Sequence, residues 1–331
     1  QSERNLAHRI IEEFMLAANE TVASFLAAQG IASLYRVHEL PEPLKVLDFE
    51  ALAAAFGYSL GIKVARVHKL RLGERQRRRL LEVPERIEIS PRHYQQLTEK
   101  LAGKPEERIL SYLMLRSLKQ ARYSEQNLGH FALAIPPASA YTHFTSPIRR
   151  YPDLIVHRLL RWCLGNISSS APLWFTQPTQ LGKPAPGPLK RPYGREELRA
   201  IALEASEAER RADDAERELM ALKTLEFMAQ HLGDEFDALV IGTSKAGFWV
   251  ELLEPDYSGV EGFVPIESLD PALYYRYDER TRTLAPRYLR RPTGYHLGDR
   301  VRVRLDRIDP MLNKMEFSVV AHLRRASGAS A

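Results

Sequence analysis

The chain has 331 residues, of which 44% are apolar and 27% are charged, and this composition excludes wholesale disorder and a collagen-like architecture. Its single cysteine, Cys163, excludes an internal disulfide scaffold and predicts a reducing compartment, which we take to be the cytoplasm. The net charge of +5 is mild, but arginines cluster at 287–291 and 300–307, as they do at polyanion sites. No long apolar run and no signal-peptide pattern occurs, so we expect no contact with a membrane.

The first part of the chain is predicted to be largely helical. Apolar residues recur at helical spacing over 5–28, and Gly30 supplies a stop. We expect a second short helix over 45–56 and a longer one over 105–122. The basic stretch 70–82 is compatible with a loop or a helix.

The middle of the chain combines a loop signal with a helix signal. Residues 166–195 are rich in proline, glycine and serine, which predicts a loop insertion. Ser206 and Glu209 have the spacing of a capping box, which predicts a highly charged helix from there to about residue 231.

The apolar period changes after Gly233 and favours short strands. Five of them are predicted, at 236–242, 247–252, 262–266, 301–305 and 314–320. In the fourth, apolar residues alternate with Arg300, Arg302 and Arg304, which predicts one buried and one basic face. Five short strands with glycines at the bends predict a small barrel of the OB-fold type.

The predicted fold class is therefore α+β. We expect a largely helical domain over 1–231, a five-stranded barrel over 232–322 and a disordered tail over 323–331.

The most informative segment is 141–161. Ser146 and Pro147 predict a helix opening, and Pro152 predicts that the helix kinks or restarts there. Free backbone N–H groups at a helix opening, next to Arg149 and Arg150, would form a phosphate site to which Thr145 and Ser146 add hydroxyls. The alternative is an ordinary capped helix whose arginines are solvated.

The run HFTSPIRRYPDLIVHR at 143–158 resembles the signature of the RNase II/RNase R family of 3′-to-5′ exoribonucleases, and most closely its RNase R branch. Four more segments resemble the family in family order, at 10–19, 34–41, 115–124 and 129–134. Residues 234–320 are similar to the S1-type RNA-binding domain. The resemblance implies an RNB catalytic domain followed by an S1 barrel.

The same resemblance implies an activity and several residue roles. Members of the family hydrolyse RNA from a single-stranded 3′ end to nucleoside 5′-monophosphates, with Mg²⁺ held by clustered aspartates. By motif position, Arg149 matches the active-site arginine that grips the phosphate, and Glu12 or Glu13 matches a glutamate that contacts the RNA ribose. Helical geometry does not choose between these two glutamates, and a solvated helix acid is the alternative for each.

The family's aspartate cluster precedes the segment that this chain resembles. The chain opens with Gln1 rather than Met, so we expect a fragment that lacks the metal ligands, that is inactive alone and that has the rest of the enzyme as its partner. The adjacent Asp213 and Asp214 fit a solvated helix face. Asp153 and His157 are expected to be structural, paired with each other or with Arg161.

The barrel departs from the S1 pattern of two aromatics around a glycine and a histidine one strand later. Those places hold Ala246, Gly247, Phe248 and Trp249, with Pro265 in the place of the histidine. Trp249 retains a stacking platform for a base, with a core residue as the alternative. Lys245, Lys314 and the basic strand are expected to supply more of the grip.

Two hypotheses from different classes remain. The first is an exoribonuclease whose metal ligands lie upstream of Gln1, and the second is a non-catalytic RNA-binding protein that retains the RNB scaffold. Clustered aspartates in the upstream reading frame or in a partner chain favour the enzyme, and their absence favours the binding protein.

Overall fold

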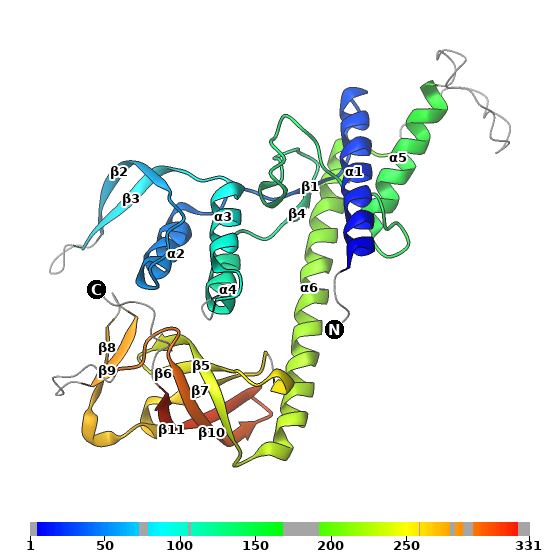
Figure 1. Ribbon diagram of the computed structural model, residues 1–331. Coiled ribbons are helices and arrows are strands. Elements are labelled where there is room, and N and C mark those ends of the chain that lie inside the picture. The colour runs from blue at the N-terminus through cyan, green and yellow to red at the C-terminus, as the bar shows by residue number, and fades with distance from the viewer. Residues whose placement is uncertain are drawn as a thin grey trace. The chain divides into compact units, whose positions relative to one another are not determined.

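The computed structural model describes residues 5–72, 79–104, 107–167, 192–257, 259–278, 282–286 and 294–323. It forms two compact units, the first made of 1–100 and 113–211 and the second of 101–112 and 212–331 (Figure 1). Most of the predicted loop at 166–195, the arginines at 287–291 and the tail beyond Leu323 lie outside the described residues. None of the described helices combines the length and apolar character needed to cross a bilayer.

Helix α1, Leu6–Ala28, agrees with the predicted first helix. The Asn5 side chain accepts a hydrogen bond from the His8 backbone N–H at 3.0 Å and so caps the helix. Gly30, at φ +65°, takes the left-handed conformation that ends it. The local signals alone were sufficient here.

The rest of the first unit contains more strand than the sequence predicted. Its elements up to residue 124 are β1 Tyr35–Val37, α2 Pro43–Ala55, β2 Lys63–Leu72, β3 Arg79–Glu88, α3 Pro91–Leu101, α4 Glu107–Ser117 and β4 Arg122–Ser124. The loop or helix expected at 70–82 is wrong for residues 70–72 and 79–82, because β2 and β3 pair there as antiparallel strands, and residues 73–78 lie outside the described residues. The helix expected over 105–122 ends at Ser117, because the chain then turns to pair β4 with β1.

Helices α5, Tyr151–Ile167, and α6, Arg195–Met228, complete this unit's core. Leu26 of α1, Ile155 of α5 and Leu198 of α6 are fully buried in one core cluster, where the three helices meet. The capping box at Ser206 is wrong, because Ser206 lies inside the 34-residue α6. Its hydroxyl donates to the carbonyl of Ala202 at 2.7 Å and accepts from the backbone N–H of Tyr123 at 2.9 Å.

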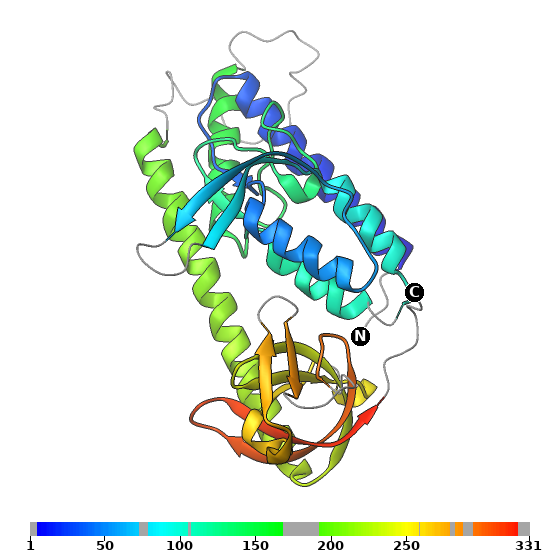
Figure 2. The same cartoon turned by 90° about the vertical axis from the view of Figure 1, so that its left-hand side faces the viewer.

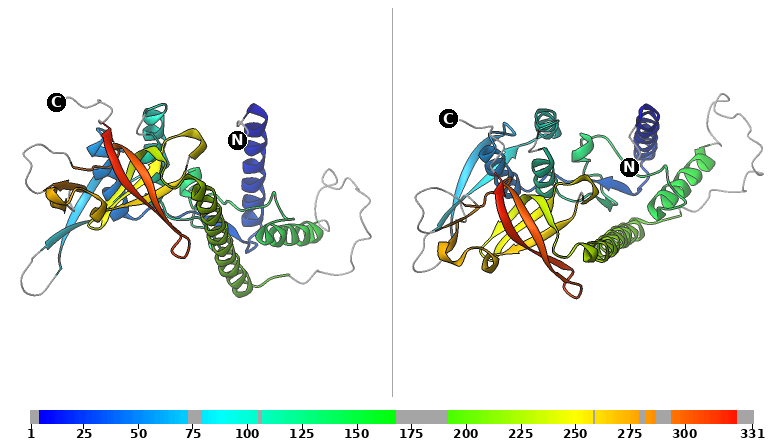
Figure 3. Two further views of the ribbon diagram at one scale, coloured as in Figure 1. Left: turned by 90° about the horizontal axis from the view of Figure 1, so that it is seen from below. Right: turned by 60° about the horizontal axis from the view of Figure 1, so that its bottom comes forward.

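The second unit contains the predicted barrel, which Figures 2 and 3 show from several sides. Its five strands close in the order β10-β11-β7-β6-β5, with bounds β5 Glu235–Ser244, β6 Gly247–Leu252, β7 Glu261–Pro265, β10 Arg300–Asp309 and β11 Lys314–Leu323. All neighbours are antiparallel except β11 and β7, where Glu316 pairs with Phe263. The fold class and the OB-type barrel are confirmed.

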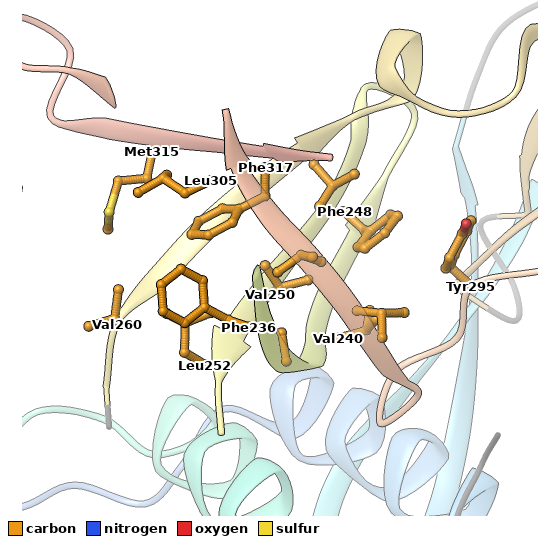
Figure 4. Close-up of a cluster of buried hydrophobic side chains, with 14 of the residues drawn as sticks. Phe236, Val240, Phe248, Val250, Leu252, Val260, Tyr295, Leu305, Met315 and Phe317 are labelled. Atoms are coloured by element: carbon orange, nitrogen blue, oxygen red, sulfur yellow. The ribbon is translucent and has the colours of Figure 1, made fainter. Parts of the chain in front are cut away.

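The barrel closes around large apolar side chains. Val301, Val303 and Leu305 are fully buried, whereas the arginines between them face solvent, as the alternation predicted. Phe248 and Phe317 fill the centre, and Tyr295 stacks on Phe248 with ring centroids 4.5 Å apart (Figure 4). The sequence did not predict the antiparallel hairpin of β8, Tyr275–Asp278, and β9, Thr283–Pro286.

Gly247 provides a test of barrel closure, because its φ is +144° and an added Cβ would lie 2.1 Å from the carbonyl oxygen of Val264. We expect Gly247→Ala to cost about 3 kcal/mol of barrel stability or more, since both strain and a backbone clash oppose it. Hydrogen exchange of the β5–β7 amides measures this loss separately from the first unit.

The matched control is Gly194→Ala, where an added Cβ meets open space at an ordinary φ. Because Gly194 is the N-cap of α6 and Ala is a weaker N-cap than Gly, the change should cost no more than about 1 kcal/mol and leave the barrel amides protected. Unchanged protection of the barrel amides in Gly247→Ala would contradict the assigned strain.

Candidate nucleic-acid interface

The motif segment forms a turn rather than the start of a helix. The Ser146 carbonyl accepts backbone N–H groups from Arg149 at 3.3 Å and from Arg150 at 3.0 Å, and regular helix begins only at Tyr151. The helix opening expected at Ser146 and Pro147 is therefore wrong, and of the two expectations for Pro152 the restart is the correct one. We call residues 145–150 the Arg149 turn.

The buried carboxylate of Asp153 holds this turn in place. Its Oδ2 accepts from the Ser146 backbone N–H at 2.8 Å and from the Arg150 guanidinium at 2.8 and 3.2 Å. Asp153 is fully buried, and its Oδ1 has no hydrogen-bond partner among the residues that the structure describes. Asp153 is therefore structural as expected, but its pairing with His157 or Arg161 is wrong.

Three further side chains fix the segment that leads into the turn. The buried Asn19 of α1 accepts from the Phe144 backbone N–H at 2.9 Å and donates to the Tyr141 hydroxyl at 3.1 Å. His157 Nε2 lies 2.8 Å from the Phe144 carbonyl, and its ring stacks on that of Phe144 at 3.9 Å. Hydrogen bonds from Asn19 of α1 and His157 of α5 therefore fix the residues that lead into the Arg149 turn.

These contacts leave the two motif arginines in different states. Arg150 is tied to Asp153, and only 21% of its side chain is exposed. Arg149 is exposed, next to the fully exposed Ile148, and forms no ion pair with the described residues. Thr145 and Ser146 are half-buried beside it. Arg149 is therefore the guanidinium of this turn that is able to meet a ligand, and the contribution of the Thr145 and Ser146 hydroxyls stays a prediction.

A cluster of aromatic rings and neutral histidines packs behind the turn. The Tyr123 hydroxyl lies 3.0 Å from His143 Nδ1, and Tyr141 contacts both His143 and His130 edge-on. Burial, with help from Arg150 and Arg36, lowers the pKa of His143 to about 3. Burial, with help from His38 and Arg36, lowers the pKa of His130 to about 4. The cluster is therefore uncharged at neutral pH.

The opposite end of this cluster contains an ion pair that the sequence did not predict. Arg36 Nη1 lies 2.5 Å from Glu209 Oε2, and the Arg36 guanidinium stacks over the Tyr123 ring at 4.7 Å. Glu209 was interpreted as part of a capping box, whereas it brings a carboxylate from α6 to this region. A usable signal was that Ser206 and Glu209, three apart, share one helix face.

The two candidate glutamates of α1 remain distinct in the structure. Glu12 is half-buried and has an interaction partner, whereas Glu13 is exposed. The same helix exposes large apolar side chains, namely Leu6, Ile10, Ile11 and Phe14. The contact of either glutamate with RNA stays a prediction.

The outer face of the barrel carries an aromatic pair, Trp249 and Phe263, which we call the platform. Trp249 is 42% exposed, so its interpretation as a core residue is wrong. The rings of Trp249 and Phe263 lie 5.0 Å apart across β6 and β7. On the other side, an added Cβ at Gly242 would lie 3.2 Å from the Trp249 ring, so this glycine leaves room for it.

The basic residues predicted on the barrel differ in availability. Arg302 pairs with Asp237 at 2.8 Å and Arg304 with Asp306 at 2.7 Å, so both charges are partly neutralised. Exposed Arg300 and Lys314 have no ion-pair partner in the described part of the chain, and Lys245 is exposed in the β5–β6 loop. Strand β10 therefore has fewer unpaired positive charges than its sequence indicates.

The model of the RNB domain family matches residues 1–166, and that of the S1 RNA binding domain matches residues 230–319. The first match covers half of the chain. The chain belongs to the RNB domain family. The Arg149 turn lies inside the RNB match, and the platform lies inside the S1 match.

Relatives with curated names support this membership. The chain is 37% identical over 317 residues to Ribonuclease R of Thermotoga maritima, covering 96% of this chain and 38% of that protein. It is 33% identical over 326 residues to Ribonuclease R of Escherichia coli, covering 98% and 35%. The chain thus spans little more than a third of the length of these relatives.

Solved structures share the fold. Mycoplasma genitalium RNase R in complex with ribose-methylated single-stranded RNA matches with a TM-score of 0.72 at 23% identity, covering 96% of this chain and 42% of that one. Yeast Ssd1, described as a pseudonuclease, matches with a TM-score of 0.57 at 21% identity, covering 87% and 30%. The RNB and S1 fold therefore occurs in a nuclease and in a pseudonuclease.

The metal that the RNB family implies does not fit the described part of this chain. Those residues contain no group of three or more His, Cys, Asp or Glu side chains that could hold a metal ion. A Mg²⁺ site needs several convergent oxygens, and Asp153 supplies one carboxylate already committed to the turn.

Removal of the Asp153 carboxylate should loosen the Arg149 turn. We expect Asp153→Ala to lower the free energy of unfolding by about 3–5 kcal/mol, because it leaves Arg150 and the Ser146 N–H without their buried acceptor. Denaturant unfolding of the chain measures the loss.

The matched control is Asp214→Ala, which removes another acid that pairs with an arginine three residues away, but on an exposed helix face. It should cost no more than about 1 kcal/mol. Equal losses in the two variants would show that the turn does not depend on Asp153.

The neutral histidines make the first unit sensitive to acid. An unfolded histidine binds its proton near pH 6.5, whereas His143 in the folded chain does so only near pH 3. The contribution of neutral His143 to the free energy of unfolding is therefore fully present above about pH 7 and decreases as the pH drops below 6.5. At pH 5 we expect a loss of about 2 kcal/mol from His143 alone.

Unfolding free energies of wild type and His143→Gln, compared at pH 7.5 and pH 5, test this expectation. The variant should be less stable at neutral pH but should lose less between the two values. An identical loss in both proteins would rule out His143 as a source of the pH dependence.

Proposed function

We propose that this chain is the RNA-gripping part of an RNase R-like enzyme that hydrolyses RNA from its 3′ end to nucleoside 5′-monophosphates. The observation that carries the proposal is the exposed Arg149, which forms no ion pair with the described residues, on a turn that Asp153 holds through the Ser146 N–H and the Arg150 guanidinium. A preorganised guanidinium is a strong phosphate ligand, because its paired N–H groups match two phosphate oxygens.

The barrel supports the same function through a different chemistry. The platform offers an exposed indole on which a base can stack whatever its identity. Arg300 and Lys314 supply cations for the RNA backbone. Binding should therefore be strong without base preference, which suits an enzyme that degrades RNA of any sequence.

We propose that the aspartates that hold Mg²⁺ are supplied by the longer polypeptide of which the relatives are examples. The exposed apolar face of α1 supports this, because Leu6, Ile10, Ile11 and Phe14 form a stripe suited to packing against further protein. When bound, the ion would activate water and stabilise the leaving oxygen. Arg149 would orient the phosphate under attack.

The alternative is a non-catalytic RNA-binding protein that retains the RNB scaffold. The absence of a metal-binding group among the described residues and the likeness to the pseudonuclease Ssd1 favour it. Clustered aspartates in the reading frame upstream of Gln1, or in a partner, distinguish the two functions. We also propose a reducing, cytoplasmic setting, which the buried free thiol of Cys163 supports.

The kinetic role of Arg149 is tested in the complete polypeptide, by single-turnover hydrolysis with nucleoside 5′-monophosphate as the measured product. We expect Arg149→Ala to lower the rate about 10²–10³-fold, because the phosphate gains charge as hydrolysis proceeds. RNA affinity with metal withheld should fall much less.

Arg149→Lys is the companion variant and should rescue little, since a point charge does not reproduce the bidentate fork. A near wild-type rate in Arg149→Ala, or equal losses of rate and affinity, would contradict the assigned role.

A further inference from the structure

The β8–β9 hairpin, labelled in Figure 1, is inserted between β7 and β10. Together with the β5–β6 loop it lines a hollow. The hollow has a volume of about 880 Å³, which lies within the range of small-ligand sites. Its walls come from one residue of the loop and from both strands of the hairpin: Lys245, Tyr275, Arg276, Tyr277, Asp278, Ala285 and Pro286.

The hairpin is fixed to the barrel, so the hollow exists before any ligand arrives. The Thr243 hydroxyl of β5 donates to the carbonyl of Arg282 at 2.7 Å. Leu284 of β9 exchanges two backbone hydrogen bonds with Tyr295, at 3.0 and 2.8 Å. Tyr295 in turn stacks on Phe248 in the barrel core. A preformed wall reduces the ordering cost of binding.

The chemistry of the lining suits one nucleotide. Tyr275 and Tyr277 are half-buried and pack against the barrel core, so the part of each residue that lines the hollow is held in place, and they alternate along β8 with exposed Arg276 and Asp278. Burial raises the pKa of the Tyr275 phenol, which keeps it a neutral hydrogen-bonding group. Exposed Arg276 supplies a cation for a phosphate, and the Asp278 carboxylate is an acceptor for a ribose hydroxyl or a base amino group.

The hollow adjoins the platform along the chain. Lys245 lies in the loop that joins β5 to β6, and Trp249 follows four residues later, about 7 Å along the strand from Gly247, where β6 begins. In OB-folds this loop borders the face that binds oligonucleotides. A strand stacked on Trp249 can therefore continue toward the hollow.

We propose that the hollow between the β8–β9 hairpin and the β5–β6 loop binds one nucleotide of a single-stranded RNA that also stacks on Trp249. The proposal rests on the proposed function only in requiring that the barrel binds RNA. It assigns the hairpin a role as a second contact, which lengthens the site and holds the strand after its base leaves the platform.

The experiment uses the whole chain and a fluorescein-labelled hexauridylate, with the Trp249 indole N–H signal followed by NMR. That signal is assigned by its loss in Trp249→Phe. Arg276→Ala should weaken hexauridylate binding about tenfold, the loss of one charge-assisted contact, and Arg276→Glu should weaken it further. In both variants hexauridylate should still shift the Trp249 signal.

One control variant and one further test variant separate the outcomes. Arg217→Ala removes an exposed arginine of α6 outside the hollow and the platform, and it should leave affinity unchanged. Tyr277→Ala should weaken binding as Arg276→Ala does, and Arg276→Ala remains the test if Tyr277→Ala unfolds, because Arg276 is exposed.

If hexauridylate shifts the Trp249 signal but Arg276→Ala binds as wild type does, the hollow is not a nucleotide site and the RNA-binding function stands. If hexauridylate neither binds the wild-type chain nor shifts the Trp249 signal, the proposed binding of RNA by the barrel is contradicted, and the proposal for the hollow is contradicted with it.

Discussion

The arrangement of the candidate site depends on one buried carboxylate. Asp153 lies in the first turn of α5, yet its bonds reach back seven residues to the Ser146 N–H and sideways to Arg150. Loss of a partner from a buried ion pair is costly, so Asp153 Oδ2 holds both the Arg150 guanidinium and the Ser146 N–H in place. The consequence is that Arg149, between them, is directed to solvent on a rigid base. This exposure is the reason we propose Arg149, rather than Arg150, as the phosphate ligand.

The two halves of the chain offer RNA two kinds of contact. The Arg149 turn provides a fixed charge supported by neutral rings, since burial keeps His143 and His130 unprotonated beside Arg36 and Arg150. The barrel provides an aromatic surface at Trp249 with cations around it. A fixed charge suits a single phosphate that reacts, whereas stacking suits bases that must slide past. The division fits stepwise removal of nucleotides from a strand.

Local signals predicted the elements that depend on local physics. The apolar spacing over 5–28 with Gly30 was sufficient for α1, and the five short strands with the alternation along β10 were sufficient for the barrel. Local sequence signals gave wrong predictions where a residue distant in the sequence determines the hydrogen bonding. Ser146 resembles a cap, but Asp153 captures its amide, and Ser206 resembles a cap but bonds to Ala202 inside a longer helix. The resemblance singled out Arg149, whereas its exposure became evident only from the tertiary bonds around it. The hairpin was missed because its strands are too short to show a period.

The central claim is that Arg149 meets an RNA phosphate, and the salt dependence of RNA affinity tests it most directly. The affinity of the chain for a single-stranded oligoribonucleotide is measured over a series of salt concentrations, for wild type, Arg149→Ala and Arg217→Ala. Each phosphate contact releases a condensed ion, so loss of one contact should reduce the log–log slope by about 0.7. The account predicts that reduction in Arg149→Ala and none in Arg217→Ala. Equal slopes for Arg149→Ala and wild type would contradict it.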